Sequence, residues 1–247
     1  LLTPETLMIC VMQVNNEVGA IQPLQEVNSL RNSLCPDALL HVDGVQGFLR
    51  LPVSLRTGID SYALSAHKVH GIKGCGALAL AERMRLKPQL FGGSQEGGLR
   101  AGTENTVGIA ALEAAVRDYP QSNNLHSLKN RLRSGLLSAI PEATVNGPDT
   151  DSAQSCGYIL NMSFPPVRAQ TMMHALEAKG VLVSQGSACS SGSPKPSRTL
   201  QAMGLHRDRM DSALRFSIGR FTTSREIDAA VDLVSECYQE LKQFTRR

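Results

Sequence analysis

The sequence contains no tryptophan, and aromatic residues make up only 4% of the chain. An excess of charge is also lacking, because 25 Lys and Arg residues against 22 Asp and Glu residues leave a net charge of +3. So small a net charge gives no reason to expect a nucleic acid or an anionic surface as a partner. No run of apolar residues is long enough to cross a bilayer. We therefore expect neither nucleic acid nor membrane among the partners.

The cysteines lack the paired spacing of a disulfide framework or a zinc site. They stand at positions 10, 35, 75, 156, 189 and 237, and none belongs to a Cys-x-x-Cys pair. Proteins that stay in the reducing cytoplasm rarely form disulfides. The pattern predicts a cytoplasmic protein without a metal site.

Short apolar runs alternate with helical patterns in the first half of the chain. Strands are expected at 7–13, 38–42, 60–65 and 75–80, with helices near 24–34, near 45–50 and from about Thr103, a plausible N-cap. This alternation is typical of an α/β layer with a mostly parallel sheet. Ligands of such sheets bind at the carboxyl ends of the strands.

A polar segment with a helix breaker, Tyr119–Asn124, is the best candidate for a domain boundary. It divides the chain into domains 1–120 and 121–247. The second domain is predicted to be a small α+β domain with strands near 143–146, 156–164, 181–184 and 213–218 and helices near 125–140, 168–180, 196–203 and 224–245.

The segment Ser61–Gly74 is a short apolar run that leads into chemically useful side chains. The run ends at Ser65, His67 and Lys68 and then meets glycines, a pattern typical of a buried strand. A partly desolvated lysine at a strand end loses its proton readily, which suits Schiff-base chemistry with an aldehyde cofactor. The alternative is an ordinary solvated loop lysine.

A second strand-like run, 38–42, ends at Asp43, and Gln46 follows three residues later. A carboxylate at a strand end can pair with the protonated ring nitrogen of pyridoxal phosphate (PLP). Gln46 can donate a hydrogen bond to the phenolic oxygen of that ring. Equally, Asp43 can serve only as the cap of the following helix.

The third feature is a loop of small residues around one cysteine, from Val183 to Ser197. Glycine and serine leave little to bury, so we expect this loop to be exposed. Most free cysteines are buried and inert. Cys189, in a polar loop, is instead accessible to substrate, as a nucleophilic thiolate must be.

Together these features resemble the cysteine desulfurases of the class V aminotransferase superfamily, in the group with a serine-rich Gly-Ser-Ala-Cys loop. The matching segments follow the family order: Met12–Gly19, His41–Asp43 with Gln46, Ser65–Gly74, Gly92–Glu96 with Arg100–Thr103, the Cys189 loop Val183–Ser197 and Arg215–Thr222. The resemblance implies the PLP-dependent transferase fold of the aspartate-aminotransferase type. It also implies that roughly the first third of a full-length enzyme is absent, and with it other phosphate-binding residues.

The resemblance assigns the cofactor site to five residues of the first domain. Lys68 would hold PLP as a Schiff base, and Asp43 would pair with the ring nitrogen. Gln46 would contact the ring oxygen, while Ser65 and His67 would bind the phosphate.

Four further residues receive roles in the same way. Asn16 would contact the ring oxygen and lie beside the substrate carboxylate, which Arg215 would bind. Thr103 would reach the phosphate in the partner subunit of a homodimer. Cys189 would be the catalytic nucleophile.

The activity implied is conversion of L-cysteine to L-alanine, with the sulfur left as a persulfide on Cys189. A sulfur-acceptor protein, such as an iron–sulfur scaffold or a tRNA-thiolation enzyme, would then receive it. Two alternatives stay open: a selenocysteine lyase or other class V PLP lyase, and a truncated, inactive fragment that acts only by binding proteins.

Overall fold

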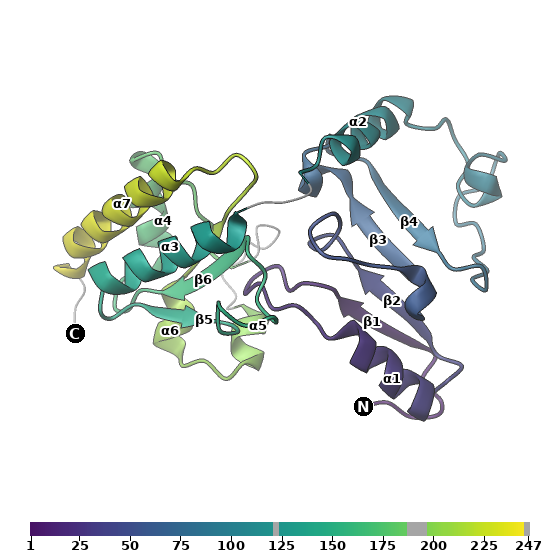
Figure 1. The fold of residues 1–247 in the computed structure, drawn as a ribbon, viewed down its shortest axis with the longest axis horizontal. Helices are drawn as coiled ribbons and strands as arrows, with labels where there is room; N and C mark the ends of the chain where they lie inside the picture. Colours follow the sequence, from purple (N-terminus) through teal and green to yellow (C-terminus); the bar gives the residue numbers. More distant parts are fainter. Residues whose placement is uncertain (121–123, 187–196, 245–247) are drawn as a thin grey trace. The chain divides into compact units, whose positions relative to one another are not determined.

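A computed structural model describes residues 1–120, 124–186 and 197–244 (Figure 1). The chain divides into two compact units. Unit 1 comprises Leu1–Val14 and Gln22–Gln121, and unit 2 comprises Asn15–Ile21 and Ser122–Arg247. The segment Asn15–Ile21 thus packs with unit 2, although its sequence neighbours on both sides belong to unit 1. The sequence did not predict this exchange, and the division into domains 1–120 and 121–247 stays a prediction.

Unit 1 is built on a four-stranded sheet. Its elements are β1 (Met8–Met12), α1 (Leu24–Leu34), β2 (Leu39–Asp43), η1 (Leu55–Thr57), β3 (Ser61–Ser65), η2 (Ala66–Val69), β4 (Gly76–Leu80), η3 (Glu96–Gly98) and α2 (Thr106–Arg117). The strand order is β1-β2-β3-β4. β1, β2 and β3 are parallel, and β4 is antiparallel to β3. The predicted α/β fold with a mostly parallel sheet is therefore confirmed.

The central strand β2 shows why this sequence forms a sheet covered by helices. Leu40 and Val42 are fully buried and alternate with half-buried residues, as the two-residue period of a strand requires. They pack in one core with Ile59 and Tyr62, and Val27 of α1 packs against that core. This packed core fixes the positions of β2 and β3, and with them the carboxyl ends of both strands.

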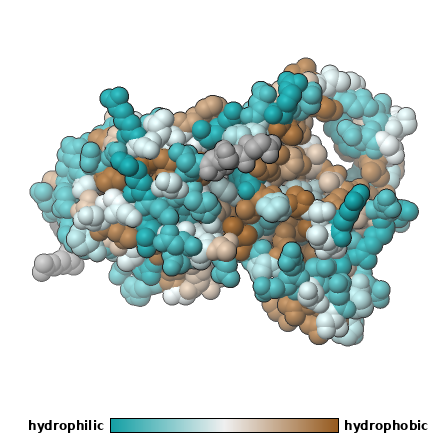
Figure 2. Space-filling model, viewed as in Figure 1, coloured by the Kyte–Doolittle hydropathy of each residue, from teal (hydrophilic) through white to brown (hydrophobic). Residues whose placement is uncertain are grey.

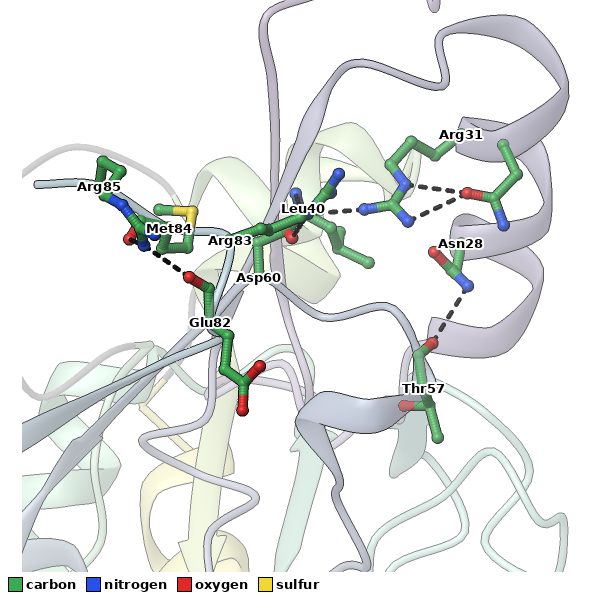
Figure 3. A network of polar contacts seen from close by, with 10 residues as sticks. Asn28, Arg31, Leu40, Thr57, Asp60, Glu82, Arg83, Met84 and Arg85 are labelled. Carbon is green, nitrogen blue, oxygen red and sulfur yellow. Dashed lines mark hydrogen bonds and ion pairs between the residues drawn. The ribbon is translucent and has the colours of Figure 1, made fainter.

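A buried ion network ties β3 to α1 and to the segment after β4 (Figure 3). Asp60, only 2% exposed, accepts hydrogen bonds from Arg31 Nη1 at 2.9 Å and from the Leu40 N–H at 2.7 Å. Arg83 donates to both carboxylate oxygens through Nε and Nη2. Burial alone raises the pKa of Asp60, but these hydrogen bonds and the charges of Arg83 and Arg31 outweigh it, so the pKa lies below its ordinary value. The network fixes the amino end of β3, while Lys68 follows its carboxyl end.

Unit 2 has a three-stranded antiparallel sheet, in the order β5-β6-β7. Its elements are α3 (Leu125–Ala139), β5 (Thr144–Asn146), β6 (Ile159–Ser163), α4 (Ala169–Ala178), α5 (Arg198–Ala202), α6 (Arg207–Asp211), β7 (Ala213–Ser217) and α7 (Ser224–Lys242). α3 packs beside α7, and α7 beside α4 (Figure 1). α7 begins at a capping box between Thr223 and Glu226 and buries Val234, Cys237 and Tyr238. Helices and sheet thus form the small α+β unit that the sequence predicts.

The predicted helix at 45–50 is wrong. These residues form successive turns, in which the Phe48 N–H bonds Gly44 O and the Leu51 N–H bonds Gly47 O. Leu49 has a φ of +62°, in the left-handed region that an α-helix excludes. Gly47, in the middle of so short a segment, also weakens any helix.

Two strands of unit 2 differ from the sequence prediction. No strand spans 181–184: the Val181 N–H closes the end of α4 on Leu176 O, and only Ser184 forms an isolated bridge, with Arg215. The strand predicted at 156–164 is shorter, because the Cys156 N–H pairs with Gly19 O. Tertiary contacts decide both boundaries.

Hydrophobic residues also reach the surface of unit 1, where Figure 2 shows brown patches among teal ones. Val107 and Ile109 of α2 are 72% and 49% exposed, and Leu78 of β4 is 48% exposed. Within the described ranges, no helix has the length and apolar character needed to cross a membrane.

Candidate active site

The carboxyl ends of β2 and β3 lie side by side and bring together most of the predicted cofactor residues. The Gly44 N–H, just after β2, donates to Ala63 O of β3 at 2.9 Å. Asp43 ends β2, whereas Ser65 ends β3 and leads directly into η2, which carries His67 and Lys68. Residues far apart in sequence therefore share one edge of the sheet.

Asp43 shapes the turn that follows β2. Its Oδ1 accepts a hydrogen bond from the Val45 N–H at 2.9 Å, so it is the cap of a turn and not of a helix. Beneath the turn, the Tyr62 hydroxyl donates to Gln13 Oε1 at 2.7 Å and lies 3.3 Å from Gly44 O. Burial and the negative charge of Asp43 raise the pKa of Tyr62 well above its usual range. The turn after β2 therefore packs against the uncharged, hydrogen-bonded side chain of Tyr62.

Glycine is required at position 44 because the Tyr62 ring occupies the space of a side chain. A Cβ on Gly44 would lie 1.8 Å from Tyr62 Cζ. The close approach of ring and backbone holds Asp43 at the edge of the sheet.

Ser65 and His67 form a hydrogen-bonded pair. Ser65 Oγ lies 2.8 Å from His67 Nδ1. Burial, with the positive charges of Lys68 and Lys73, lowers the pKa of His67 below its ordinary value. An uncharged imidazole beside a hydroxyl, close to two lysines, presents hydrogen-bonding groups in a positive environment, as an anion requires.

Lys68 is half-buried in η2, and its ammonium group makes no hydrogen bond or ion pair within the part of the chain that the structure describes. Its carbonyl oxygen, by contrast, accepts a hydrogen bond from Arg50 Nη2 at 2.5 Å. The backbone of Lys68 is thus held while its amine stays available. Lys68 stands on the short helix η2, which contacts α2, and its role as the Schiff-base lysine stays a prediction.

Gln46 is buried and joined to the same arginine. Arg50 Nη1 lies 3.1 Å from Gln46 O and 3.3 Å from Gln46 Oε1. The structure therefore brings Gln46 into one polar network with the backbone of Lys68.

Thr103 is not the N-cap of the next helix. α2 begins at Thr106, and Asn105 caps it by accepting a hydrogen bond from the Gly108 N–H at 3.0 Å. Asparagine is a better N-cap than threonine, which accounts for the choice. Thr103 is exposed in the segment before the helix, and its contact with a phosphate stays a prediction.

In unit 2 the structure brings Asn16 and Arg215 together. Arg215 lies in β7, only 8% exposed, and donates through Nη1 to Asn16 O at 2.8 Å. It is therefore a buried residue and not a surface arginine of a strand. Asn15 Oδ1 accepts from the N–H groups of Glu17 and Val18, which fixes the bend that carries Asn16.

Cys189 lies outside the described residues, so its predicted role is not tested by geometry. Glu17, which sequence reasoning did not single out, contacts the last residue of the cysteine loop and the helix α5 that follows it. Its carboxylate accepts hydrogen bonds from Ser197 Oγ at 2.5 Å and from Thr199 Oγ1 at 3.4 Å. Ser197 in turn caps α5. No local sequence pattern signals a contact between residues this far apart.

Sequence reasoning also missed Gln13, Tyr62 and Arg50. Gln13, just after β1, and Tyr62 of β3 support the Asp43 turn, and Arg50 joins Gln46 to Lys68. One available signal was the phenol of Tyr62 inside a buried strand, since a buried tyrosine hydroxyl needs a partner.

The comparisons with known proteins agree with this fold. The sequence profile described as aminotransferase class-V matches residues 1–230. The chain belongs to the class-V aminotransferase family.

Within this family, the chain is similar to proteins named cysteine desulfurase. The chain is 37% identical over 249 residues to Cysteine desulfurase 2 of Trichormus variabilis, covering 99% of this chain and 61% of that protein. It is 36% identical over 247 residues to Cysteine desulfurase IscS of Methanosarcina thermophila, covering 98% and 60%. Among solved structures, a NifS-like protein superposes with a TM-score of 0.85 at 32% identity, covering 98% of this chain and 63% of that one. The chain thus spans about 60% of the length of the curated relatives it matches.

Proposed function

We propose that this chain is part of a PLP-dependent cysteine desulfurase that converts L-cysteine to L-alanine and takes the sulfur onto Cys189 as a persulfide. The observation that carries the proposal is the edge of the sheet where Asp43, the Ser65–His67 pair and the uncommitted amine of Lys68 follow adjacent strands. The curated relatives named cysteine desulfurase support it. They do not favour the selenocysteine-lyase or protein-binding alternatives.

The residues at this edge fit PLP in the type and order of their chemical groups. The cofactor needs a carboxylate for its ring nitrogen, donors for a phosphate and an amine for its aldehyde. Asp43 offers an oxygen beyond the one bound to the Val45 N–H, Ser65 and His67 offer hydroxyl and imidazole, and Lys68 offers the amine. When bound, PLP supplies an electron sink for the bonds at the substrate Cα.

The residues of the chain would then divide the work as follows. Asp43 would hold a proton on the ring nitrogen, and Gln46 would donate to the ring oxygen. Ser65 and His67 would bind the phosphate, and Thr103 of the partner subunit would complete that site. Lys68 Nζ would take the proton from the substrate Cα, because an uncharged amine close to that carbon can act as the general base.

Substrate binding and sulfur transfer fall to unit 2. Arg215 would bind the substrate carboxylate, for which a guanidinium is better shaped than an ammonium group, with Asn16 beside it. The Cys189 thiolate attacks the substrate sulfur, an S–S bond forms, and the Cβ–S bond breaks. The electron pair of that bond stays on the carbon skeleton, which takes up one proton at Cβ, recovers one at Cα in place of the proton that Lys68 removed, and leaves as alanine. L-cysteine as substrate is supported by a structure at 29% identity, SspA in complex with cysteine.

Borohydride reduction of the purified protein with PLP, followed by peptide mass spectrometry, tests the cofactor assignment. We expect the reduced adduct on Lys68 and none on the nearby Lys73. A second digestion after incubation with L-cysteine should show the added sulfur on Cys189. An adduct on another lysine, or no adduct, would overturn the assignment.

The proposed enzyme acts as a cytoplasmic homodimer that hands its sulfur to an acceptor protein, an iron–sulfur scaffold or a tRNA-thiolation enzyme. The IscS name of one relative supports an acceptor of the first kind. Sedimentation velocity distinguishes dimer from monomer, and full activity in a demonstrated monomer would exclude a phosphate site shared through Thr103.

A further inference from the structure

Arg50 uses every nitrogen of its guanidinium group inside unit 1. Nη2 donates to Lys68 O at 2.5 Å, and Nη1 donates to Gln46 O at 3.1 Å and to Gln46 Oε1 at 3.3 Å. Nε donates to the Tyr119 hydroxyl at 3.3 Å, and Tyr119 is itself buried after the end of α2. A single side chain thus joins the turn after β2, the short helix η2 and the segment that follows α2.

We propose that Arg50 is a positioning residue for the PLP site, which orients the backbone of Lys68 and the side-chain amide of Gln46 together. The proposal rests on the proposed function, because these two residues are its Schiff-base lysine and ring-oxygen donor.

The first part of the argument is the backbone of Lys68. η2 ends at His70, whose φ of +70° is left-handed, and the N–H groups of His70 and Gly71 both bond to Ala66 O. The Lys68 carbonyl, one of the last in this short helix, is therefore left to Arg50. A charged donor at 2.5 Å fixes the peptide from which the Lys68 side chain extends.

The second part is the orientation of the Gln46 amide. Arginine has only donors, so the atom of Gln46 that faces Arg50 must be the oxygen. The NH2 group of the amide then lies on the other side, and this is the polarity that donation to the phenolic oxygen of PLP requires. Arg50 thereby determines which end of Gln46 is offered to the cofactor.

The planar guanidinium is suited to this task because its donors point along several fixed directions at once. A lysine at position 50 would keep the charge but would bring one compact ammonium group. Arg50→Lys should therefore retain only part of the effect, whereas Arg50→Met should lose it. Arg85→Met is the matched control, since Arg85 of the same unit also donates to two main-chain carbonyls, those of Glu82 and Met84, but is exposed.

The test compares these variants by the rate at which PLP attaches to Lys68, read by its visible absorbance, and by amide hydrogen exchange in η2. We expect Arg50→Met to slow attachment by about tenfold or more, the effect of one lost charged hydrogen bond. The wavelength of bound PLP should also shift, because a reoriented Gln46 changes the hydrogen bond to the ring oxygen. Exchange at His70 and Gly71 should accelerate, with Arg50→Lys intermediate and Arg85→Met like the parent.

Parental attachment, absorbance and exchange in Arg50→Met would overturn the proposal. Parental behaviour in Arg50→Lys would refute the part that depends on the planar group. Should Arg50→Met fail to fold, Arg50→Lys carries the same test. If PLP attaches to no lysine of the parent protein, the proposed function fails, and exchange at His70 and Gly71 then decides on its own whether Arg50 holds Lys68.

Discussion

Replacing Asp60 by asparagine should destabilise unit 1 by about 3 kcal/mol, because it leaves Arg31 charged and buried without a counterion. The side chain of Arg31 is only 6% exposed and cannot turn to water without opening the core. Arg83 contributes less, since its side chain is 49% exposed, and an exposed pair is worth at most about 1 kcal/mol. Asparagine can still accept the hydrogen bond from the Leu40 N–H, so the loss is mainly the buried charge pair.

Native-state hydrogen exchange measures this effect unit by unit. Amides of β2 and β3 in Asp60→Asn should lose protection by roughly a hundredfold, which corresponds to the expected free energy. Amides of β6 in unit 2 serve as the internal reference, and Arg83→Gln is the control, with an expected loss of about 1 kcal/mol or less. A loss below about 1 kcal/mol in Asp60→Asn would refute the view that the pair with Arg31 stabilises this sheet.

The same network predicts how stability depends on pH. The pKa of Asp60 is lower in the folded protein than its ordinary value, so the folded state binds fewer protons at this group than the unfolded state. Its stabilisation is therefore complete above the unfolded pKa of about 4 and is lost as the pH falls through the lower folded value. Protection of β2 and β3 should decline with acid in the parent and should show less of this decline in Asp60→Asn.

Three further substitutions test the candidate site. Gly44→Ala should lower the free energy of unfolding by at least about 1–3 kcal/mol, because the new methyl group would overlap the Tyr62 ring. Gly219→Ala is the control in thermal unfolding and should change little, since its added Cβ would meet nothing within 4 Å. A Gly44→Ala variant as stable as the parent would disprove the packing argument. Asp43→Asn keeps the turn acceptor, so the fold should persist while turnover falls by about tenfold or more, the cost of a charged hydrogen bond; parental turnover would show that Asp43 is only a turn cap. Cys189→Ala should still bind PLP yet form no persulfide in mass spectrometry, and alanine production at the parental rate would exclude Cys189 as the nucleophile.

Local sequence pattern was enough for most of the strands and for the edge of the sheet where the site lies. The apolar runs before Asp43 and before Ser65 predicted β2 and β3, because residues that a sheet buries are mostly hydrophobic. Because β2 and β3 are parallel, the residues after them had to meet at one edge. The prediction of a helix at 45–50 was wrong because Leu49 has a left-handed backbone conformation, which depends on tertiary contacts and not on the local sequence.

Only the tertiary structure decided which polar groups meet across long stretches of chain. Asn15–Ile21 packs with unit 2 because its backbone pairs with the segment around Ser155, far away in the sequence. The buried Arg215 donates a hydrogen bond to the main chain of Asn16, far away in the sequence. Arg50 donates one to the main chain of Lys68 from a turn whose conformation residue propensities do not predict. Hydrogen bonds of this kind depend on distances of a few tenths of an ångström and on direction, whereas the order of residues records only which groups are able to make them.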